Sequence, residues 1–171
     1  MSLGRSGWLA DFESFVAARM SSLLSYAYAL TGERREAEDL VQEALIRTGL
    51  AWHRVLRKDQ PDAYVKTTVL RLYINSRRSR RNPPVAAYEP DNGRLDPGYA
   101  QIEDQDALRK ALAQVPPKMR AVLVLRYLEG MADEQIAVAL RCSRGTVRTQ
   151  AARGLARLRA AYTSEVANHD A

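Results

Sequence analysis

The chain has 171 residues, of which 46% are hydrophobic and 7% aromatic, and a formal net charge of +6. The hydrophobic content argues against a globally disordered chain, and the predominance of alanine, leucine and arginine over aromatic residues favours helices over sheets. Cys142 is the single cysteine and His53 and His169 are the two histidines, so no internal disulfide can form and a Cys/His zinc site is not expected.

Three amphipathic helices are predicted in the front half of the chain. The first covers residues 9–30 and ends before Gly32, because glycine readily takes the left-handed conformation that follows many helix ends. The second covers residues 33–52 and has an acidic face opposite its apolar stripe. That face either complements the helix dipole or docks a basic partner, and periodicity leaves both interpretations open. The polar residues of this face are Glu36, Glu38, Asp39, Gln42 and Glu43.

Basic residues concentrate in a predicted loop, residues 53–60, and in a third helix that begins at Pro61 and runs to about residue 81. Residues 47–81 contain ten lysines and arginines against two aspartates, which leaves a net charge of +8. This exceeds what a helix C-terminus needs to offset its dipole, and it predicts contact with nucleic acid. Tyr64 and Tyr73 are either stacking rings for bases or half-buried core residues.

A proline-rich, acidic segment at residues 82–104 separates the two halves of the chain. Proline fixes φ and lacks a donor, so no long helix is expected in this segment. The rear half is predicted to contain four helices. The first begins near Asp104, and the second follows Pro116 and Pro117, is apolar almost all round and ends at Glu129 before Gly130.

The strongest pattern lies in the last two helices, residues 133–140 and 143–162, which are joined by a short connection. A helix, a tight turn and a basic second helix are typical of a helix-turn-helix, although an ordinary terminal helix with a solvated basic face is the alternative. Residues 141–159 contain six arginines and no acid, which suits a polyanion. The N-terminal residues of such a helix reach base edges first. The predicted DNA-contact residues are Arg144, Thr146, Arg148, Thr149, Gln150, Arg153 and Arg157.

No pattern for catalysis is found in the sequence. It has no glycine-rich phosphate loop before a helix, no HExxH motif and no nucleophile with a base partner. We therefore expect no enzymatic activity, no cofactor, no metal site and no small-molecule substrate. The absence of a signal peptide and of an apolar run of 18 residues predicts a cytoplasmic protein that does not enter a membrane.

Two segments resemble one known family. EAEDLVQEALIRTGLAW, at residues 36–52, is similar to the second conserved region of bacterial RNA polymerase sigma factors. LAQVPPKMRAVLVLRYLEGMADEQIAVALRCSRGTVRTQAARGLARLR, at residues 112–159, is similar to their fourth region. The layout resembles the short actinobacterial-type subgroup of the extracytoplasmic-function (ECF, group 4) sigma factors of the sigma-70 family. The resemblance implies an all-α fold, with a three-helix region 2 domain at 8–82, a flexible linker at 83–104 and a helix-turn-helix region 4 domain at 105–162.

This resemblance implies a sigma factor that binds core RNA polymerase, recognises the −10 and −35 elements of promoter DNA and helps to melt it. Region 4 would contact the −35 element through the helix-turn-helix residues named above. The linker would follow the RNA exit path of the polymerase. An anti-sigma factor is a common partner in the family, and the sequence leaves open whether one exists here. The implied core-binding residues are Glu38, Asp39, Gln42 and Glu43, and the implied −10 residues are Lys58, Lys66, Arg71, Asn75, Arg77 and Arg78.

Two residues depart from the family pattern. Ala132 stands where the family usually has a serine or threonine cap, so either Asp133 caps the helix or stability falls by about 1 kcal/mol. Arg141 stands where the turn commonly has glycine, and a non-glycine residue in a left-handed turn costs about 1 kcal/mol.

Two other function classes remain open from the residues themselves. A helix-turn-helix repressor would bind a palindromic operator as a dimer, and it would need a ligand pocket or a dimer face in the front half of the chain. An adaptor that binds a partner helix would show no salt-dependent affinity for DNA, whereas phosphate contacts make affinity fall steeply with salt.

Overall fold

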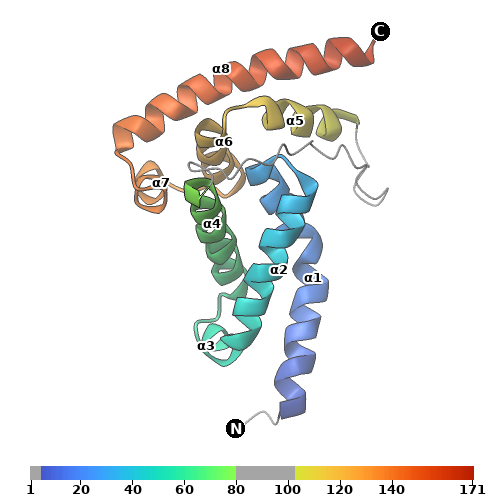
Figure 1. Cartoon of the computed structure of the whole chain (residues 1–171), viewed down its shortest axis with the longest axis vertical. Helices are drawn as coiled ribbons and strands as arrows, with labels where there is room; N and C mark the ends of the chain where they lie inside the picture. Colours follow the sequence, from blue (N-terminus) through green and yellow to red (C-terminus); the bar gives the residue numbers. More distant parts are fainter. Residues whose placement is uncertain (1–4, 80–102) are drawn as a thin grey trace. The chain divides into compact units, whose positions relative to one another are not determined.

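The computed structural model describes residues 5–79 and 103–171, and every regular element in these ranges is a helix (Figure 1). The predicted all-α fold class is therefore confirmed. The chain divides into two compact units, one formed by residues 1–28 and 35–89 and the other by residues 29–34 and 90–171. Almost all of the predicted linker lies outside the described residues, and its last two positions, 103 and 104, already belong to a helix.

The first unit contains α3 (Trp52–Arg57), α4 (Pro61–Ser79) and most of α1 (Arg5–Thr31) and α2 (Arg34–Leu50). The end of α1 and the first residue of α2, within residues 29–34, belong to the second unit. Buried apolar residues of α1, α2 and α4 follow the helical spacing seen in the sequence. Trp52 is 2% exposed and packs against Phe12 and Phe15, with ring centroids 5.1 and 5.2 Å away. Gly32, after α1, has a φ of 71°, as its predicted role at the helix end requires.

The prediction of a basic loop at residues 53–60 was wrong for its first half. Residues 52–57 form α3, because Trp52 and Val55 stand three positions apart and are both buried in the same cluster. The basic side chains between them point outward and obscured this short apolar face in the sequence. The helix ends before Asp59, which takes a φ of 53°. Among its described residues, the first unit thus has the short helix α3 in addition to the three that were predicted.

The second unit contains α5 (Glu103–Gln114), α6 (Pro117–Leu123), the π-helix η2 (Val124–Leu128), α7 (Asp133–Leu140) and α8 (Arg144–His169). Helix α8 packs against α5, α6 and α7, and Figure 1 shows it running along α5. A Cβ added at Gly154 would lie 3.2 Å from Leu123 and Met119, so this glycine allows α8 to approach α6 closely. The helix predicted to end at residue 162 continues to His169, and Gln114 donates a 2.6 Å hydrogen bond to Glu165 in the added turns.

The second predicted helix of this unit differs in burial and in helix type between its first part and its last turn. Residues 120–125 are buried, as expected for a central helix. The last turn is π-helical, and Tyr127 and Leu128 are 55% and 62% exposed, so the expectation of burial all round was wrong there. Gly130 follows with a φ of 64°, as predicted for the stop.

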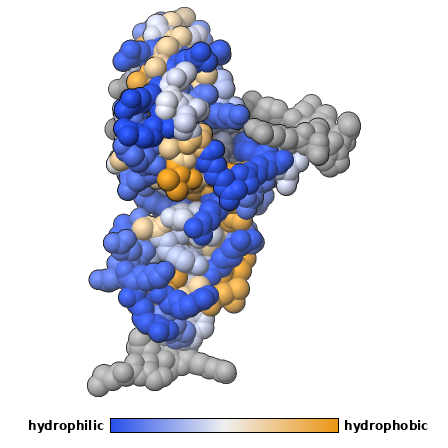
Figure 2. Space-filling model, turned by 90° about the vertical axis from the view of Figure 1, so that its left-hand side faces the viewer, coloured by the Kyte–Doolittle hydropathy of each residue, from blue (hydrophilic) through white to orange (hydrophobic). Residues whose placement is uncertain are grey.

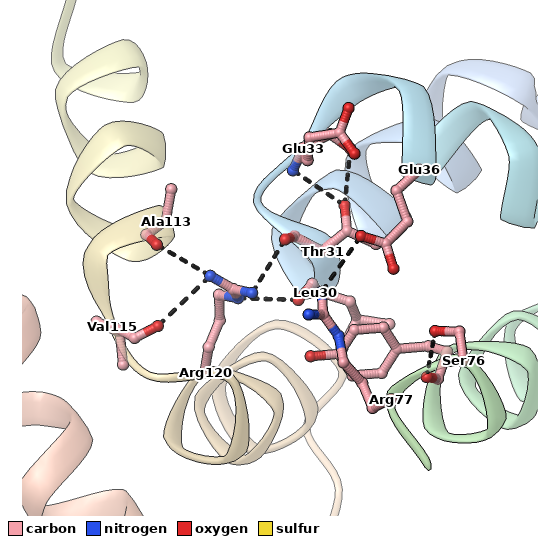
Figure 3. Close-up of polar contacts among 10 residues, drawn as sticks. Leu30, Thr31, Glu33, Glu36, Ser76, Arg77, Ala113, Val115 and Arg120 are labelled. Atoms are coloured by element: carbon pink, nitrogen blue, oxygen red, sulfur yellow. Dashed lines mark hydrogen bonds and ion pairs between the residues drawn. The ribbon is translucent and has the colours of Figure 1, made fainter. Parts of the chain in front are cut away.

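Arg120 is a buried cation in the second unit. Its side chain is 4% exposed, although the sequence analysis attached no role to it. The guanidinium donates hydrogen bonds of 2.8 and 3.0 Å to the carbonyl oxygens of Leu30 and Thr31 and of 3.0 and 3.4 Å to those of Ala113 and Val115 (Figure 3). These carbonyls belong to the last turns of α1 and α5 or follow them directly. Helix ends leave such carbonyls without partners inside the helix, and a cation there also offsets the helix dipole.

The described surface is largely polar on one face. On the face drawn in Figure 2 most side chains are hydrophilic, and apolar side chains come to the surface in a few patches. Scattered apolar side chains are normal on a protein surface, so only those that line up on one helix face point to a binding surface. Among the described residues, the exposed large apolar side chains are Leu9, Ile46, Leu50, Tyr64, Leu108, Tyr127, Leu128 and Val138.

Candidate nucleic-acid and polymerase interfaces

Helices α7 and α8 form the predicted helix-turn-helix. Arg141 ends α7 in a left-handed conformation, with φ 54° and ψ 52°. Ser143 is the N-cap of α8, and its Oγ accepts a 3.0 Å hydrogen bond from the backbone N–H of Thr146. Ile136 and Val147 are fully buried between the helices and hold the angle of the motif.

Most of the predicted DNA-contact residues of α8 are exposed. Thr146 and Thr149 share the first two turns with Arg144 and Arg148, and Arg153 and Arg157 follow along the helix. Gln150 differs, because its Oε1 is buried and has no hydrogen-bond partner within the part of the chain that the structure describes. Six of the seven predicted residues therefore present their side chains on the surface of α8.

Acidic residues at the start of α7 contact the arginines of α8. Asp133 Oδ2 lies 3.7 Å from Arg148 Nε, and Glu134 Oε1 lies 3.0 Å from Arg144 Nη2. From the sequence, Asp133 was expected only as an alternative cap of α7. In the structure the N–H of Ala132 donates to Gln135 Oε1 at 2.9 Å instead, and the Asp133 carboxylate faces arginines. The charge signal was present in the sequence, but the pairing depends on how α7 and α8 cross.

Helix α4 divides the predicted −10 residues into two groups. Arg71, Asn75 and Arg78 are exposed and recur at helical spacing, and Tyr64, two turns earlier, is 36% exposed. Lys58 is exposed just after α3. Tyr64, Arg71, Asn75 and Arg78 form the α4 stripe. Lys58 precedes α4 in the sequence and is not part of this stripe.

The other two −10 candidates face the body of the first unit. Lys66 Nζ lies 3.4 Å from Asp62 Oδ2 and 5.7 Å from the ring of Tyr26. Arg77 Nη2 lies 3.2 Å from Glu36 Oε2 (Figure 3). The guanidinium carbon of Arg77 lies 5.1 Å from the centroid of the Tyr73 ring. Tyr73 is 3% exposed, so of its two interpretations the structure supports the core residue.

Helix α2 presents a mixed face to solvent. Of the predicted core-binding residues, Asp39 and Gln42 are exposed, whereas Glu38 and Glu43 are half-buried. Glu43 Oε1 accepts a 2.8 Å hydrogen bond from Arg47 Nε. Ile46 and Leu50, which sequence analysis missed, are 60% and 85% exposed at the same helical spacing. Their signal was available, because both are apolar residues that fall off the buried stripe of α2.

Within residues 5–79 and 103–171 no helix is long and apolar enough to cross a membrane. The same ranges contain no group of three or more histidine, cysteine or acidic residues placed to hold a metal ion.

Comparisons with known proteins give the family. The model of sigma-70 region 2 matches residues 15–82, and the model of sigma-70 region 4 matches residues 105–158. The RNA polymerase sigma-E factor of Streptomyces avermitilis is 35% identical over 153 residues, which cover 90% of this chain and 86% of that protein. The ECF RNA polymerase sigma factor SigE of Mycolicibacterium smegmatis is 30% identical over 96% of this chain and 67% of that protein. The chain belongs to the ECF sigma factors of the sigma-70 family.

A solved structure shares the fold of this sigma factor. The sigma factor RpoE of Bartonella quintana, crystallised in complex with the anti-sigma factor NepR, aligns with a TM-score of 0.60 at 22% identity, over 90% of this chain and 97% of that one. As a sigma factor, the protein binds core RNA polymerase and directs promoter-specific initiation of transcription. The repressor and adaptor alternatives are thereby set aside.

Proposed function

We propose that α8 contacts the −35 promoter element and that its residues divide between bases and phosphates. Arg144, Thr146, Arg148 and Thr149 lie in the first two turns, where a recognition helix reaches base edges in the major groove. Arg153 and Arg157 lie further along and contact phosphates. We leave Gln150 out of this set because its Oε1 is buried.

The α4 stripe is the proposed −10 surface. Arg71, Asn75 and Arg78 offer charge and hydrogen bonds to a single strand, and the exposed ring of Tyr64 can stack on a base. Lys58 adds a phosphate contact before α4. Lys66 and Arg77 support the helix through their ion pairs with Asp62 and Glu36 and do not contact DNA directly.

The exposed face of α2 is the proposed contact with core polymerase. Asp39 and Gln42 supply polar groups, and Ile46 and Leu50 supply apolar area that is exposed in the free protein. An interface with an apolar centre and a polar rim is the usual arrangement of a stable protein contact. Glu38 and Glu43 lie at the edge of this face.

The two modules in this proposal are region 2 at residues 8–82 and region 4 at residues 105–162. The protein contributes binding, and the polymerase carries out the chemistry. By analogy with the RpoE–NepR complex, we include an anti-sigma factor among the candidate partners. The single observation that carries the proposal is that α2, α4 and α8 each expose predicted contact residues, and these helices lie in regions matched to sigma factors.

Run-off transcription with purified bacterial core RNA polymerase tests the proposal. The templates come from a promoter pool in which the −35 and −10 segments are randomised, and enriched promoters are then transcribed individually. Arg148→Ala should lower transcription from −35-dependent promoters without changing core affinity, and Asp39→Arg should weaken core affinity. Arg159→Ala, which removes an exposed arginine outside the proposed set, is the matched control. Equal transcription by the Arg148 variant and the parent would overturn the −35 assignment.

A further inference from the structure

Asp133 lies between two arginines that come from different helices. Its Oδ1 is 3.6 Å from Arg126 Nε in the π-helix η2, and its Oδ2 is 3.7 Å from Arg148 Nε in α8. The Asp133 side chain is 17% exposed, whereas that of Arg148 is 64% exposed. One largely buried carboxylate therefore contacts the inner end of an exposed arginine on the proposed DNA-binding face.

The contact atom on Arg148 matters for recognition. Nε is the guanidinium nitrogen nearest the backbone, and the two terminal nitrogens lie beyond it. A guanine is recognised by a fork of two donors on its O6 and N7. A carboxylate at Nε leaves the edge formed by the two terminal nitrogens for such a fork. It also restricts the long side chain before DNA arrives, and this lowers the entropy cost of ordering it in the complex.

Asp133 is itself held in place. It is the first residue of α7, where the helix dipole favours a negative charge. Arg126 contacts its other carboxylate oxygen and lies 5.7 Å from the centroid of the neighbouring Tyr127 ring. The carboxylate thus lies at the start of α7 and forms an ion pair with η2, in addition to its contact with Arg148 of α8.

The neighbouring pair provides a contrast. Glu134 and Arg144 are 3.0 Å apart, but their side chains are 58% and 54% exposed. Exposed ion pairs of this kind are screened by solvent and contribute little to holding a side chain in one geometry. Removing the Glu134 charge should change the general attraction to DNA and leave the geometry of the recognition residues as it was.

We propose that Asp133 is a positioning residue that orients Arg148 toward one guanine of the −35 element and sharpens discrimination at that base pair. This inference rests on the proposed role of α8. A purely electrostatic role predicts a different result for removal of the Asp133 charge. An acid beside a DNA-binding surface repels phosphate, so its loss would strengthen binding to every sequence alike.

The test compares Asp133→Asn with Glu134→Gln, because each substitution removes one negative charge from the same turn. The full chain is assembled with purified core RNA polymerase and offered a duplex pool with a randomised −35 segment, and the bound fraction is sequenced. Glu134→Gln should bind all sequences slightly better with unchanged base preferences. Asp133→Asn should reduce the preference for guanine over the other bases roughly tenfold at one position. This is the same position that Arg148→Ala affects. In the Arg148→Ala background, Asp133→Asn should have no further effect at that position.

A neutral residue at position 133 also weakens the start of α7, so Asp133→Glu is the second variant. It keeps the charge but moves the carboxylate by one methylene, and it should reduce the same preference without raising general affinity. If the parent enriches no sequence, the proposed function fails. If the parent enriches a −35 sequence and both Asp133 variants keep its preference at every position, this inference alone is overturned.

Discussion

Arg77 and Glu36 form an ion pair between α4 and α2, with Nη2 3.2 Å from Oε2. The Glu36 side chain is 8% exposed and the Arg77 side chain 30% exposed, so the pair lies at the edge of the core of the first unit. The adjacent residue, Arg78, is exposed on the α4 stripe. Two neighbouring arginines of one basic segment thus have different surroundings, and we expect them to have different roles.

Arg77→Ala should destabilise region 2, and Arg78→Ala should not. Loss of Arg77 leaves the largely buried Glu36 carboxylate without this cation, and a charged hydrogen bond in such a place contributes about 2 kcal/mol. Urea unfolding of the two variants measures the difference at equal net charge. Arg78→Ala should instead weaken binding of the holoenzyme to a −10 single strand. Equal unfolding midpoints for the two variants would contradict the structural role of Arg77.

Arg141→Gly should stabilise the helix-turn-helix by about 1 kcal/mol. Arg141 has a φ of 54°, in the left-handed region where a side chain with a Cβ is strained and glycine is not. Arg141→Ala is the matched control, because it removes the same charge but keeps the Cβ. The free energy of unfolding, measured with urea, should rise for the glycine variant relative to the alanine variant. Indistinguishable values would show that the turn is not strained.

Arg120→Met should lower the free energy of unfolding by about 2 kcal/mol or more. The substitution removes the donor to four carbonyl oxygens in a buried site, and buried acceptors that lose their partners carry a desolvation penalty. Lys118→Met makes the same change of charge at an exposed position of the same helix and should be close to neutral. Thermal unfolding of both variants provides the comparison, and similar melting temperatures would contradict the prediction.

Replacing both Ile46 and Leu50 by serine should weaken core polymerase binding about tenfold or more while leaving stability nearly unchanged. Both side chains are largely exposed in the free protein, so the substitutions remove little apolar area that folding buries. They do remove apolar area that a complex with core polymerase would bury. Val138→Ser, at a position that is 80% exposed on α7, is the control for exposed apolar area in general. Fluorescence anisotropy with labelled sigma factor measures core affinity. Parental affinity in the double variant would exclude this face of α2.

Salt dependence should separate the phosphate contacts of α8 from its base contacts. Arg153→Ala and Arg157→Ala should each weaken holoenzyme binding to all −35 sequences alike and reduce the slope of log K against log salt by about 1. Arg148→Ala should instead weaken binding mainly to the preferred sequence. Binding isotherms at several salt concentrations, on an enriched duplex and on a scrambled one, provide the measurement. A sequence-selective loss in the Arg153 or Arg157 variant would reverse the assignment.

Local patterns in the sequence were enough to predict the described helices other than α3 and the helix-turn-helix, and the resemblance of two segments to sigma factors indicated the family. Helical periodicity depends on residues three or four positions apart, and the turn glycines at 32 and 130 act on the chain next to them. The short helix α3 was missed because its apolar face contains few residues and lies among basic ones. The exposed Ile46 and Leu50 were missed because the acidic residues on the same face of α2 made that face read as polar.

Only the tertiary structure decided which charges meet. Glu36 and Arg77 are 41 positions apart, and Asp133 contacts arginines that lie on either side of it in sequence. Periodicity predicts which residues share a helix face, but the crossing of two helices determines which acid stands opposite which arginine. For this reason the sequence by itself indicated a basic DNA-binding surface, whereas the packing separated the arginines that stabilise the fold, Arg77 and Arg120, from those left at the surface of α4 and α8.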